Sequence, residues 1–286
     1  MNRALALCAL HAAVLLFGFA GLFGKWVALP PLLIVLARTA IAAAALGLFR
    51  IARPTGTPTF ELGLFASGAV LAVHWVSFFA AIDAADVATG LLGYASFPLF
   101  TLLLERLPGR QRWSRRDVST ALLVVAGFAL MVPEFTFANR KVVGLLWGVV
   151  SGFSFALLAV LNLRQAARRA ASDIAFWQNL SAMIALLPAA LLAQYTLPAG
   201  AVGTREIVLL LALGVFCTAL AHTLFIGSLR SITAHTASVV AALEPAYGIA
   251  LAFLILGERP GARTLAGGVA LVAAAMIASG RGGGQR

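Results

Sequence analysis

The sequence predicts an all-α integral membrane protein in which ten transmembrane helices form two inverted five-helix repeats. Three observations carry this prediction: an apolar composition, a series of apolar stretches of membrane-spanning length, and an internal repeat. Hydrophobic residues make up 62% of the 286 residues, charged residues make up 11%, and the mean hydropathy is +0.98. An ordinary soluble domain of this size does not need so much apolar surface. The composition therefore indicates a lipid bilayer as the surroundings of the chain.

Apolar stretches follow one another along the whole chain. A hydrocarbon layer of roughly 30 Å takes about 20 apolar helical residues to cross. The loops between the stretches are short, so no segment is long enough to form a separate soluble domain. We expect ten spans, over residues 4–27, 31–49, 62–82, 88–104, 118–132, 142–163, 174–194, 207–229, 236–256 and 264–278.

The second half of the sequence repeats features of the first at an offset of about 148 residues. His74 matches His222 at this offset, and a slip of one residue matches Pro98 to Pro245, each of which is expected to be a hinge or helix break. We expect a first repeat over residues 1–137 and a second over residues 138–286. Each holds five spans, an odd number, so the second enters the membrane from the opposite side. Two inverted halves can exchange conformations, which is the basis of alternating access in transporters.

The net charge of +11 is distributed as in a membrane protein. In a soluble protein it would suggest a nucleic-acid partner, so its placement decides the interpretation. With a cytoplasmic N-terminus, the inner segments carry 14 Lys and Arg residues and the outer segments carry 6. By the positive-inside rule, both termini are cytoplasmic. The expected partners are the lipid bilayer and a small-molecule substrate, and not nucleic acid.

Glu244 is the strongest candidate for the substrate pathway, because it falls near the middle of the ninth span. An ionised and unpaired carboxylate is strongly disfavoured there, so this side chain is expected to be neutral, paired or in contact with water. Pro245 follows it and lacks an N–H group, which leaves a backbone carbonyl one turn earlier without its helical partner. The resulting polar notch suits a substrate ammonium or a proton. The alternative is a hinge whose glutamate caps neighbouring backbone groups.

Hydroxyl groups on the fourth and ninth spans are further candidates. Tyr94, Pro98 and Thr101 are spaced by four and three residues, which places them on one face of a helix bordering the cavity. Thr101 can instead bond its own helix backbone. Tyr247 lies one turn after Glu244 and faces the same notch, or serves as packing.

The paired histidines, His74 and His222, lie at mirrored depths in the third and eighth spans. A polar ring inside the bilayer usually faces a protein interior or a water-filled cavity. The alternative is that neighbouring backbone carbonyls bind both rings. Proton antiport through Glu244 or a histidine is a further hypothesis.

Several other residues are expected to hold helices together. Arg38 is assigned a structural role in the second span, and Gln178 and Asn179 can bind helix to helix. Two glycine stripes let helices approach closely, on the first span at Gly18, Gly21 and Gly24, and on the sixth at Gly144, Gly148 and Gly152.

An enzyme is disfavoured by the absence of motifs. The sequence contains neither His-Glu-x-x-His nor Gly-x-Ser-x-Gly, and its four histidines lie on four different spans. It has no Gly-x4-Gly-Lys loop for ATP. Cys8 and Cys217 lie inside apolar spans and form no disulfide framework or metal-ligand spacing. We expect no catalytic residue, no cofactor and no metal site.

Short segments in order along both halves resemble the drug/metabolite transporter superfamily, specifically its ten-helix EamA-type members. The similar segments are residues 16–19 and 23–25 on the first span, 38–42 on the second, and 243–245, 256–259 and Gly267 onward near the end of the chain. Each motif is weak alone, and their order and spacing make the combined signal strong. The chain departs from a symmetric pattern where Gly109-Arg110 stands opposite Gly257-Glu258.

This resemblance implies export or exchange of small metabolites across a bacterial inner membrane. Bacterial ten-helix members include amino-acid exporters of the YddG type, so the resemblance suggests amino acids as substrates. Export of drugs or other amphiphilic metabolites, and a passive channel for small solutes, are the alternatives. The substrate, the coupling ion and the oligomeric state do not follow from the sequence.

Overall fold

The computed structural model describes residues 2–52, 61–106, 114–132, 136–193, 195, 201–232, 237 and 240–279. These residues form helices and no strand, so the all-α prediction is confirmed for them. Seven helices in the described ranges are long and apolar enough to cross a membrane. Three shorter apolar helices accompany them, at Asp117–Met131, Glu244–Leu256 and Ala262–Ile277.

The helices follow the expected apolar stretches closely. In the first half they are α1 (Arg3–Trp26), α2 (Pro31–Ala52), α3 (Leu62–Ala84), α4 (Val87–Tyr94), α5 (Phe97–Arg106) and α6 (Arg115–Met131). In the second half they are α7 (Arg140–Ala166), α8 (Ala171–Leu192), α9 (Thr204–Gly214), the π-helical turn η1 (Val215–Leu220), α10 (Ala221–Ser228), α12 (Glu244–Leu251), the π-helical turn η2 (Ala252–Leu256) and α13 (Ala262–Ser279).

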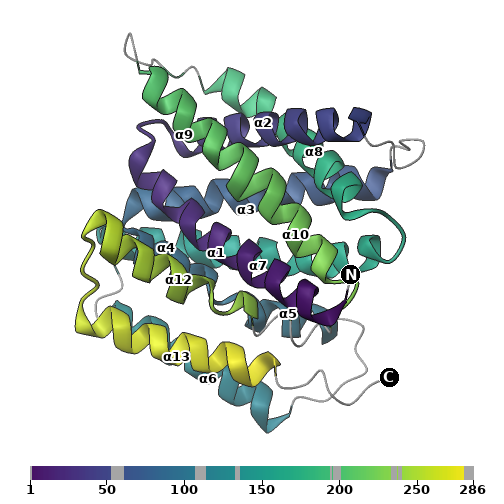
Figure 1. The fold of residues 1–286 in the computed structure, drawn as a ribbon. Helices are drawn as coiled ribbons and strands as arrows, with labels where there is room; N and C mark the ends of the chain where they lie inside the picture. The colour runs from purple at the N-terminus through teal and green to yellow at the C-terminus, as the bar shows by residue number, and fades with distance from the viewer. Residues whose placement is uncertain are drawn as a thin grey trace.

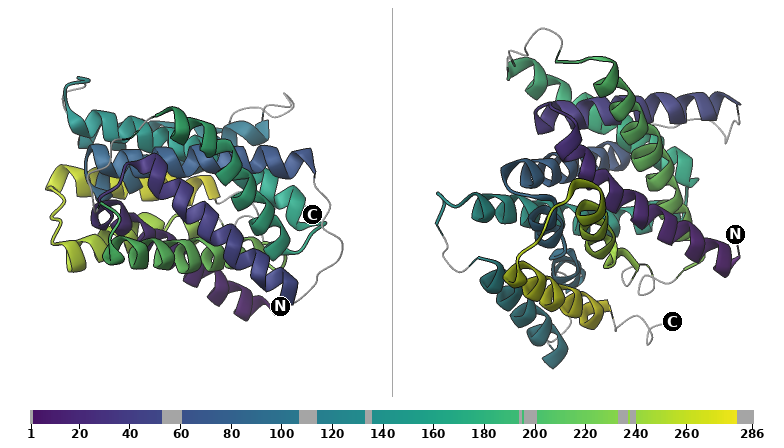
Figure 2. Two further views of the ribbon diagram at one scale, coloured as in Figure 1. Left: turned by 90° about the horizontal axis from the view of Figure 1, so that it is seen from above. Right: turned by 60° about the vertical axis from the view of Figure 1, so that its left-hand side comes forward.

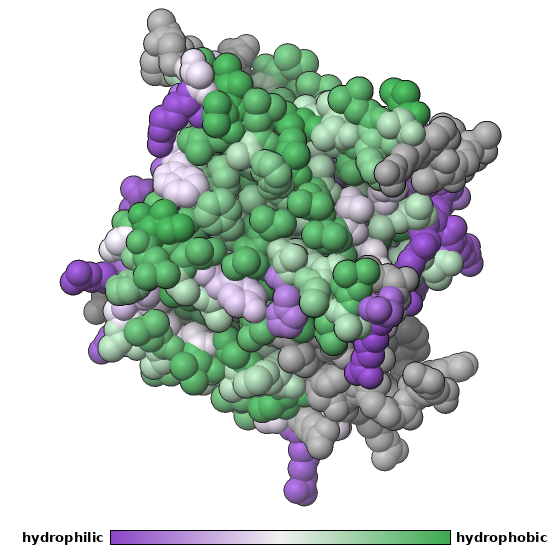
Figure 3. Space-filling model, viewed as in Figure 1, coloured by the Kyte–Doolittle hydropathy of each residue, from purple (hydrophilic) through white to green (hydrophobic). Residues whose placement is uncertain are grey.

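The helices form a bundle with two polar ends. We call the end that holds the start of α1 and the end of α7 the near end, and the end that holds Trp26 and Arg140 the far end. These lie to the right and left of Figure 1. Hydrophilic side chains gather mainly toward these two margins in Figure 3, with a broad hydrophobic surface between them. This distribution fits a protein whose middle is in contact with lipid.

The two halves pack against each other in matching pairs. The third helix of the first half, α3, packs on α7 and α8, while α9, η1 and α10 of the second half pack on α1 and α2. Likewise α4 packs on α7, and α12 packs on α1. The helices α2 and α8 contact each other, as do α6 and α13, which lie together at the lower edge of Figure 1 and of the right-hand view of Figure 2.

Two expected spans are broken close to Pro98 and Pro245, as expected for hinge prolines, and the places of the turns correct two details of the sequence analysis. The fourth span turns at Ala95 and Ser96, between α4 and α5, so Tyr94 and Thr101 do not share one continuous helical face. The ninth span turns at residues 242–243, and Glu244 begins α12 instead of lying inside a helix. Each turn comes two to three residues before a proline, Pro98 or Pro245. Proline has no N–H to donate to the carbonyl four residues earlier, and its ring clashes with that carbonyl.

Glycines allow the broken helices to approach the other half closely. A Cβ atom on Gly148 of α7 would lie 2.8 Å from the Cα atom of Gly93 of α4, and one on Gly18 of α1 would lie 2.9 Å from the backbone nitrogen of Gly248 of α12. The rest of the two predicted stripes also borders other helices. Gly144 faces Ala81 and Ala85, Gly152 faces residues 94–97, and Gly21 and Gly24 face Phe78, Phe79, Ile82 and Val87.

At the far end, three side chains bind the backbone between residues 82 and 87, where α3 ends and α4 begins. The Lys25 ammonium donates to two carbonyl oxygens there at 2.6 and 3.0 Å, and the Arg140 guanidinium donates to two others at 2.8 and 3.1 Å. The Glu258 carboxylate accepts from the Val87 N–H, with its oxygens 3.2 and 3.4 Å from the nitrogen. These contacts satisfy backbone groups that helix ends leave free.

Replacing Gly148 with alanine is expected to destabilise the fold by about 1–3 kcal/mol, because the added methyl group would meet backbone atoms that cannot move aside. The variant should melt at a lower temperature in detergent than the natural protein. The matched control is Gly63→Ala, since a Cβ at Gly63 has no neighbour within 4 Å. Equal melting temperatures for the two variants would contradict the proposed contact.

The half-buried Glu258 gives a pH-dependent prediction, because burial raises the pKa of its carboxyl group above the ordinary value. Because the pKa of Glu258 is raised in the folded state, its protonated carboxyl group contributes to stability below the ordinary pKa. This contribution is lost as the pH rises through the raised pKa. Glu258→Gln keeps an acceptor for Val87 without the charge. Relative to the natural protein, its melting temperature should rise on the order of 2 °C between pH 4 and pH 8. A constant difference across this range would refute the prediction.

Candidate functional site

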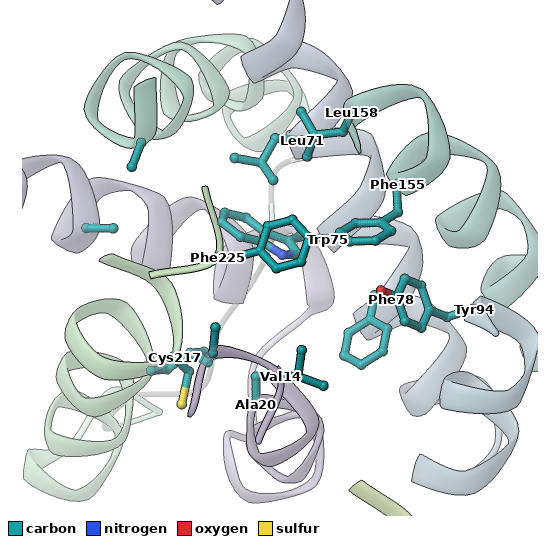
Figure 4. Packing of buried hydrophobic residues seen from close by; sticks show 14 of the residues in the cluster. Val14, Ala20, Leu71, Trp75, Phe78, Tyr94, Phe155, Leu158, Cys217 and Phe225 are labelled. Carbon is teal, nitrogen blue, oxygen red and sulfur yellow. The ribbon is translucent and has the colours of Figure 1, made fainter. Parts of the chain in front are cut away.

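A narrow cavity lies in the centre of the bundle between the two halves. Aromatic side chains form most of its wall, and Trp75, Phe78, Tyr94, Phe155 and Phe225 reach toward it from different helices (Figure 4). Polar groups face it from both halves. The lining residues are Phe17, Ala20, Arg38, Leu71, His74, Trp75, Phe78 and Tyr94 from the first half and Phe155, Leu158, Asn162, His222, Phe225 and Glu244 from the second.

Arg38 provides the positive charge of the cavity, and it is held rigidly. Its Nε donates to the Thr218 hydroxyl at 2.9 Å, and its Nη2 donates to the Cys217 carbonyl at 3.1 Å. Its guanidinium carbon lies 4.0 Å from the centre of the Trp75 ring, a cation–π contact. Both hydrogen-bond partners lie in η1, where the widened π-helical turn presents a carbonyl and a hydroxyl sideways. Arg38 is 1% exposed, so these contacts compensate for burying its charge.

Glu244 provides the carboxyl group of the cavity and comes from the other half of the chain. As the first residue of α12, it projects into the cavity beside Tyr94 of α4. The Tyr94 hydroxyl is buried and interacts with the Glu244 carboxyl, in a geometry short of a regular hydrogen bond. Tyr94 and Glu244 therefore form a polar pair on the cavity wall, to which a ligand can add a hydrogen-bond partner.

The two histidines border the same cavity from α3 and α10. The His74 Nδ1 lies 3.0 Å from the Ser151 carbonyl oxygen, and this oxygen can only accept a hydrogen bond. The Ser151 hydroxyl oxygen lies 2.9 Å from the same nitrogen and can donate to it or accept from it, so Ser151 holds this edge of the ring. The His222 ring meets Trp75 edge to face, with 5.9 Å between the ring centroids, and its Nδ1 is 3.5 Å from the Asn179 amide nitrogen. Both histidines have protein neighbours and still line the cavity.

The cavity is small in this conformation and is followed by a second one. Its free space is about 30 Å³, enough for about two water molecules. Toward the near end lies an apolar pocket of about 70 Å³, which we call the near pocket. Phe155 and Phe225 belong to the walls of both, with their ring centroids 6.0 Å apart. The other residues of the near pocket are Phe97, Thr101, Ala159, Val160, Leu163, Leu229, Ala237 and Ala241.

Two sequence candidates lie away from the charged groups. Thr101 lines the near pocket, and its hydroxyl donates to the Phe97 carbonyl at 3.0 Å, as the alternative interpretation expected. The break after α4 separates it from Tyr94. Tyr247 lines neither cavity, and its hydroxyl is 3.2 Å from Nδ1 of His11. The rotation of the helix after Glu244 turns this ring toward α1.

Some lining residues have no distinctive signal in the sequence. Phe155 and Phe225 are apolar residues in apolar helices, and only packing shows that they separate the two cavities. Asn162 is different, because a buried amide in a membrane helix is itself a reason to expect a polar partner. Arg38 carried the same signal, although the expectation for it was purely structural.

The arrangement suits a molecule that carries both charges. A carboxylate fits the guanidinium of Arg38, and an ammonium fits the Glu244 carboxylate with the Tyr94 hydroxyl beside it. The aromatic wall excludes water and strengthens both attractions. Within the described residues, no three His, Cys, Asp or Glu side chains form a group that could hold a metal ion.

Comparison with known proteins shows similarity to transporters. Residues 142–280 match the model of the EamA-like transporter family. An uncharacterized transporter of Archaeoglobus fulgidus is 28% identical over 71% of this chain and 70% of its own. The transporter YxxF of Bacillus subtilis, also uncharacterized, is 22% identical over 91% and 84% of the two chains. The pseudopaline exporter CntI of Pseudomonas aeruginosa is 29% identical over 88% and 87%.

A solved crystal structure shares the fold across nearly the whole chain. It superposes with a TM-score of 0.70 and covers 97% of this chain and 98% of its own, with 21% sequence identity. This chain, whose described helices include several that are long and apolar enough to cross a membrane, is therefore similar to the EamA-like transporter family over residues 142–280 and to transporter relatives over 71–91% of its length.

Proposed function

We propose that this protein exports small zwitterionic metabolites, with amino acids as the first class to test, from the cytoplasm across a bacterial inner membrane. The observation that carries the proposal is the presence of one arginine and one glutamate, from different halves of the chain, on the wall of a single cavity. Arg38 binds the substrate carboxylate, and Glu244 binds the substrate ammonium. The exporter among the relatives and the resemblance to YddG-type amino-acid exporters support the direction and the substrate class.

Alternating access follows from two inverted halves, residues 1–137 and 138–286, each with five spans. The packing supports this repeat, because the main contacts between the halves have counterparts. The contacts α3 with α7 and α10 with α1 correspond, as do α5 with α7 and α12 with α1. The turns before Pro98 and Pro245 also recur at corresponding places. The near end is then cytoplasmic, and rocking of the halves opens the cavity to either side.

The narrow cavity supports a carrier over a passive channel. About 30 Å³ leaves no space for an amino acid, so the helices around the cavity must separate for a substrate to enter. A carrier of this kind gives flux that saturates with concentration. Counterflow in proteoliposomes that contain only this protein, with a panel of labelled amino acids, tests the proposal. Absence of flux for amino acids and related zwitterions would reject the substrate class, and flux without saturation would favour a channel.

Glu244→Gln is expected to reduce transport of a zwitterionic substrate at least about tenfold, because the substrate ammonium loses a buried charged partner. The loss should appear mainly as a higher KM. The matched control is Glu206→Gln, which changes a carboxylate at the first turn of α9 at the far end and should leave transport unchanged. Equal transport by the two variants would remove Glu244 from the binding site.

A further inference from the structure

A cluster of uncharged polar side chains lies between the central cavity and the near end, where α3, α7 and α8 meet. It consists of Ser67, Asn162, Gln165 and Gln178, and we call it the amide cluster. Asn162 also lines the central cavity, and Gln165 is half-buried at the near end. The cluster therefore connects the cavity with the near end by a polar route that is separate from the apolar near pocket.

Three oxygen atoms of the cluster converge on one point. The Nε2 atom of Gln178 occupies it, 2.6 Å from Oδ1 of Asn162 and 3.0 Å from both Oγ of Ser67 and Oε1 of Gln165. An amide nitrogen has two hydrogens to donate to these three acceptors. Oxygen acceptors from three side chains therefore surround the point.

Other hydrogen bonds hold two of the three oxygens in this orientation. The Ser67 hydroxyl hydrogen is donated to the Leu64 carbonyl at 3.0 Å, so its oxygen presents lone pairs to the cluster. The Gln165 amide nitrogen donates to the Gly63 carbonyl at 3.1 Å and to the Ser67 hydroxyl oxygen at 3.2 Å, which turns its own oxygen toward Gln178. The convergence of oxygens is therefore fixed by the backbone of α3.

The Gln178 carbonyl oxygen, Oε1, is the unexplained atom. Gln178 is fully buried, and Oε1 has no hydrogen-bond partner in the described part of the chain. When an amide group rotates by half a turn, its nitrogen and oxygen atoms exchange positions. Reversal here would bring Oε1 in as a fourth oxygen and would take the Gln178 donor away from the Asn162 and Gln165 oxygens. This second orientation becomes favourable when a positive ion supplies the missing attraction.

We propose that the amide cluster binds one monovalent cation, for which Na⁺ is the probe. Hard cations take oxygen ligands, and amide, hydroxyl and carbonyl oxygens hold Na⁺ in membrane transporters. The four proposed ligands are uncharged, which favours a single positive charge over a divalent ion that needs carboxylates. A water molecule suits the site less well, because it donates only two hydrogens to oxygens that all accept.

The site occurs once in the chain, although the fold is repeated. The position 148 residues after Ser67 is Val215, and the positions 148 residues before Asn162 and Gln165 are Val14 and Phe17. The cation is thus bound only on the side of the cavity that faces the near end. There it joins α3 of the first half to α7 and α8 of the second, so its binding stabilises this arrangement of the halves.

Binding of ²²Na⁺ to the purified full-length protein in detergent tests the proposal without any transport measurement. A failure of this test leaves the zwitterion proposal intact, and the reverse also holds. We expect saturable binding of about one ion per chain, and Ser67→Ala should weaken it about tenfold because one ligand is lost. Competition with KCl and NH₄Cl identifies the preferred monovalent ion.

Two further variants keep the test decisive. Gln165→Glu places a carboxylate at a half-buried ligand position and should tighten binding about tenfold. Ser77→Ala is the matched control for Ser67→Ala, since Ser77 is a buried serine of α3 whose hydroxyl bonds only its own helix. It should bind the ion like the natural protein. Absence of saturable binding of any of the three ions, or equal affinity in Ser67→Ala, Gln165→Glu and the natural protein, would overturn the proposal.

Discussion

The close approach of broken helices to the opposite half is the constraint on which the rest of the structure depends. Gly93 meets Gly148, and Gly18 meets Gly248, at distances that leave no space for a side chain. In a membrane, where lipid is as apolar as the helix surfaces, such backbone contacts are a main source of helix association. They bring the start of α12 and the end of α4 to the centre of the bundle. Glu244 and Tyr94 can reach the cavity only because these contacts exist.

Burial of a guanidinium and a carboxyl group is the second consequence of this packing. The guanidinium of Arg38 is compensated by Thr218, the Cys217 carbonyl and the Trp75 ring, all supplied around a π-helical turn. Glu244 has fewer protein partners, and Tyr94 beside it lacks a well-formed hydrogen bond. The positive side of the cavity is thus prepared in advance, whereas the negative side is left for a ligand to complete. A zwitterion matches this asymmetry and bridges the two halves while it is bound.

The sequence predicted the helical class, the positions of the spans and four polar residues that line the cavity, because these depend on hydropathy and on polar residues that stand out in apolar helices. It marked Pro98 and Pro245 as breaks, but the turn itself forms two to three residues before each proline. The turn before Pro98 separates Thr101 from Tyr94, and Tyr247 lies beside His11 instead of at the cavity. Phe155 and Phe225 could not be identified from the sequence. An aromatic residue in a membrane helix has the same sequence pattern whether it lines a cavity or packs against other helices. Gln178 was expected to join helices, but its orphan oxygen appears only in three dimensions.

The central claim is that Glu244 recognises a substrate ammonium while Arg38 recognises the carboxylate of the same molecule. The most direct test measures counterflow of an amino-acid substrate and of its analogue without the amino group, in the natural protein and in Glu244→Gln. The natural protein should prefer the amino acid, and the substitution should reduce this preference at least about tenfold because only the ammonium contact is lost. The same preference in both proteins would contradict the account.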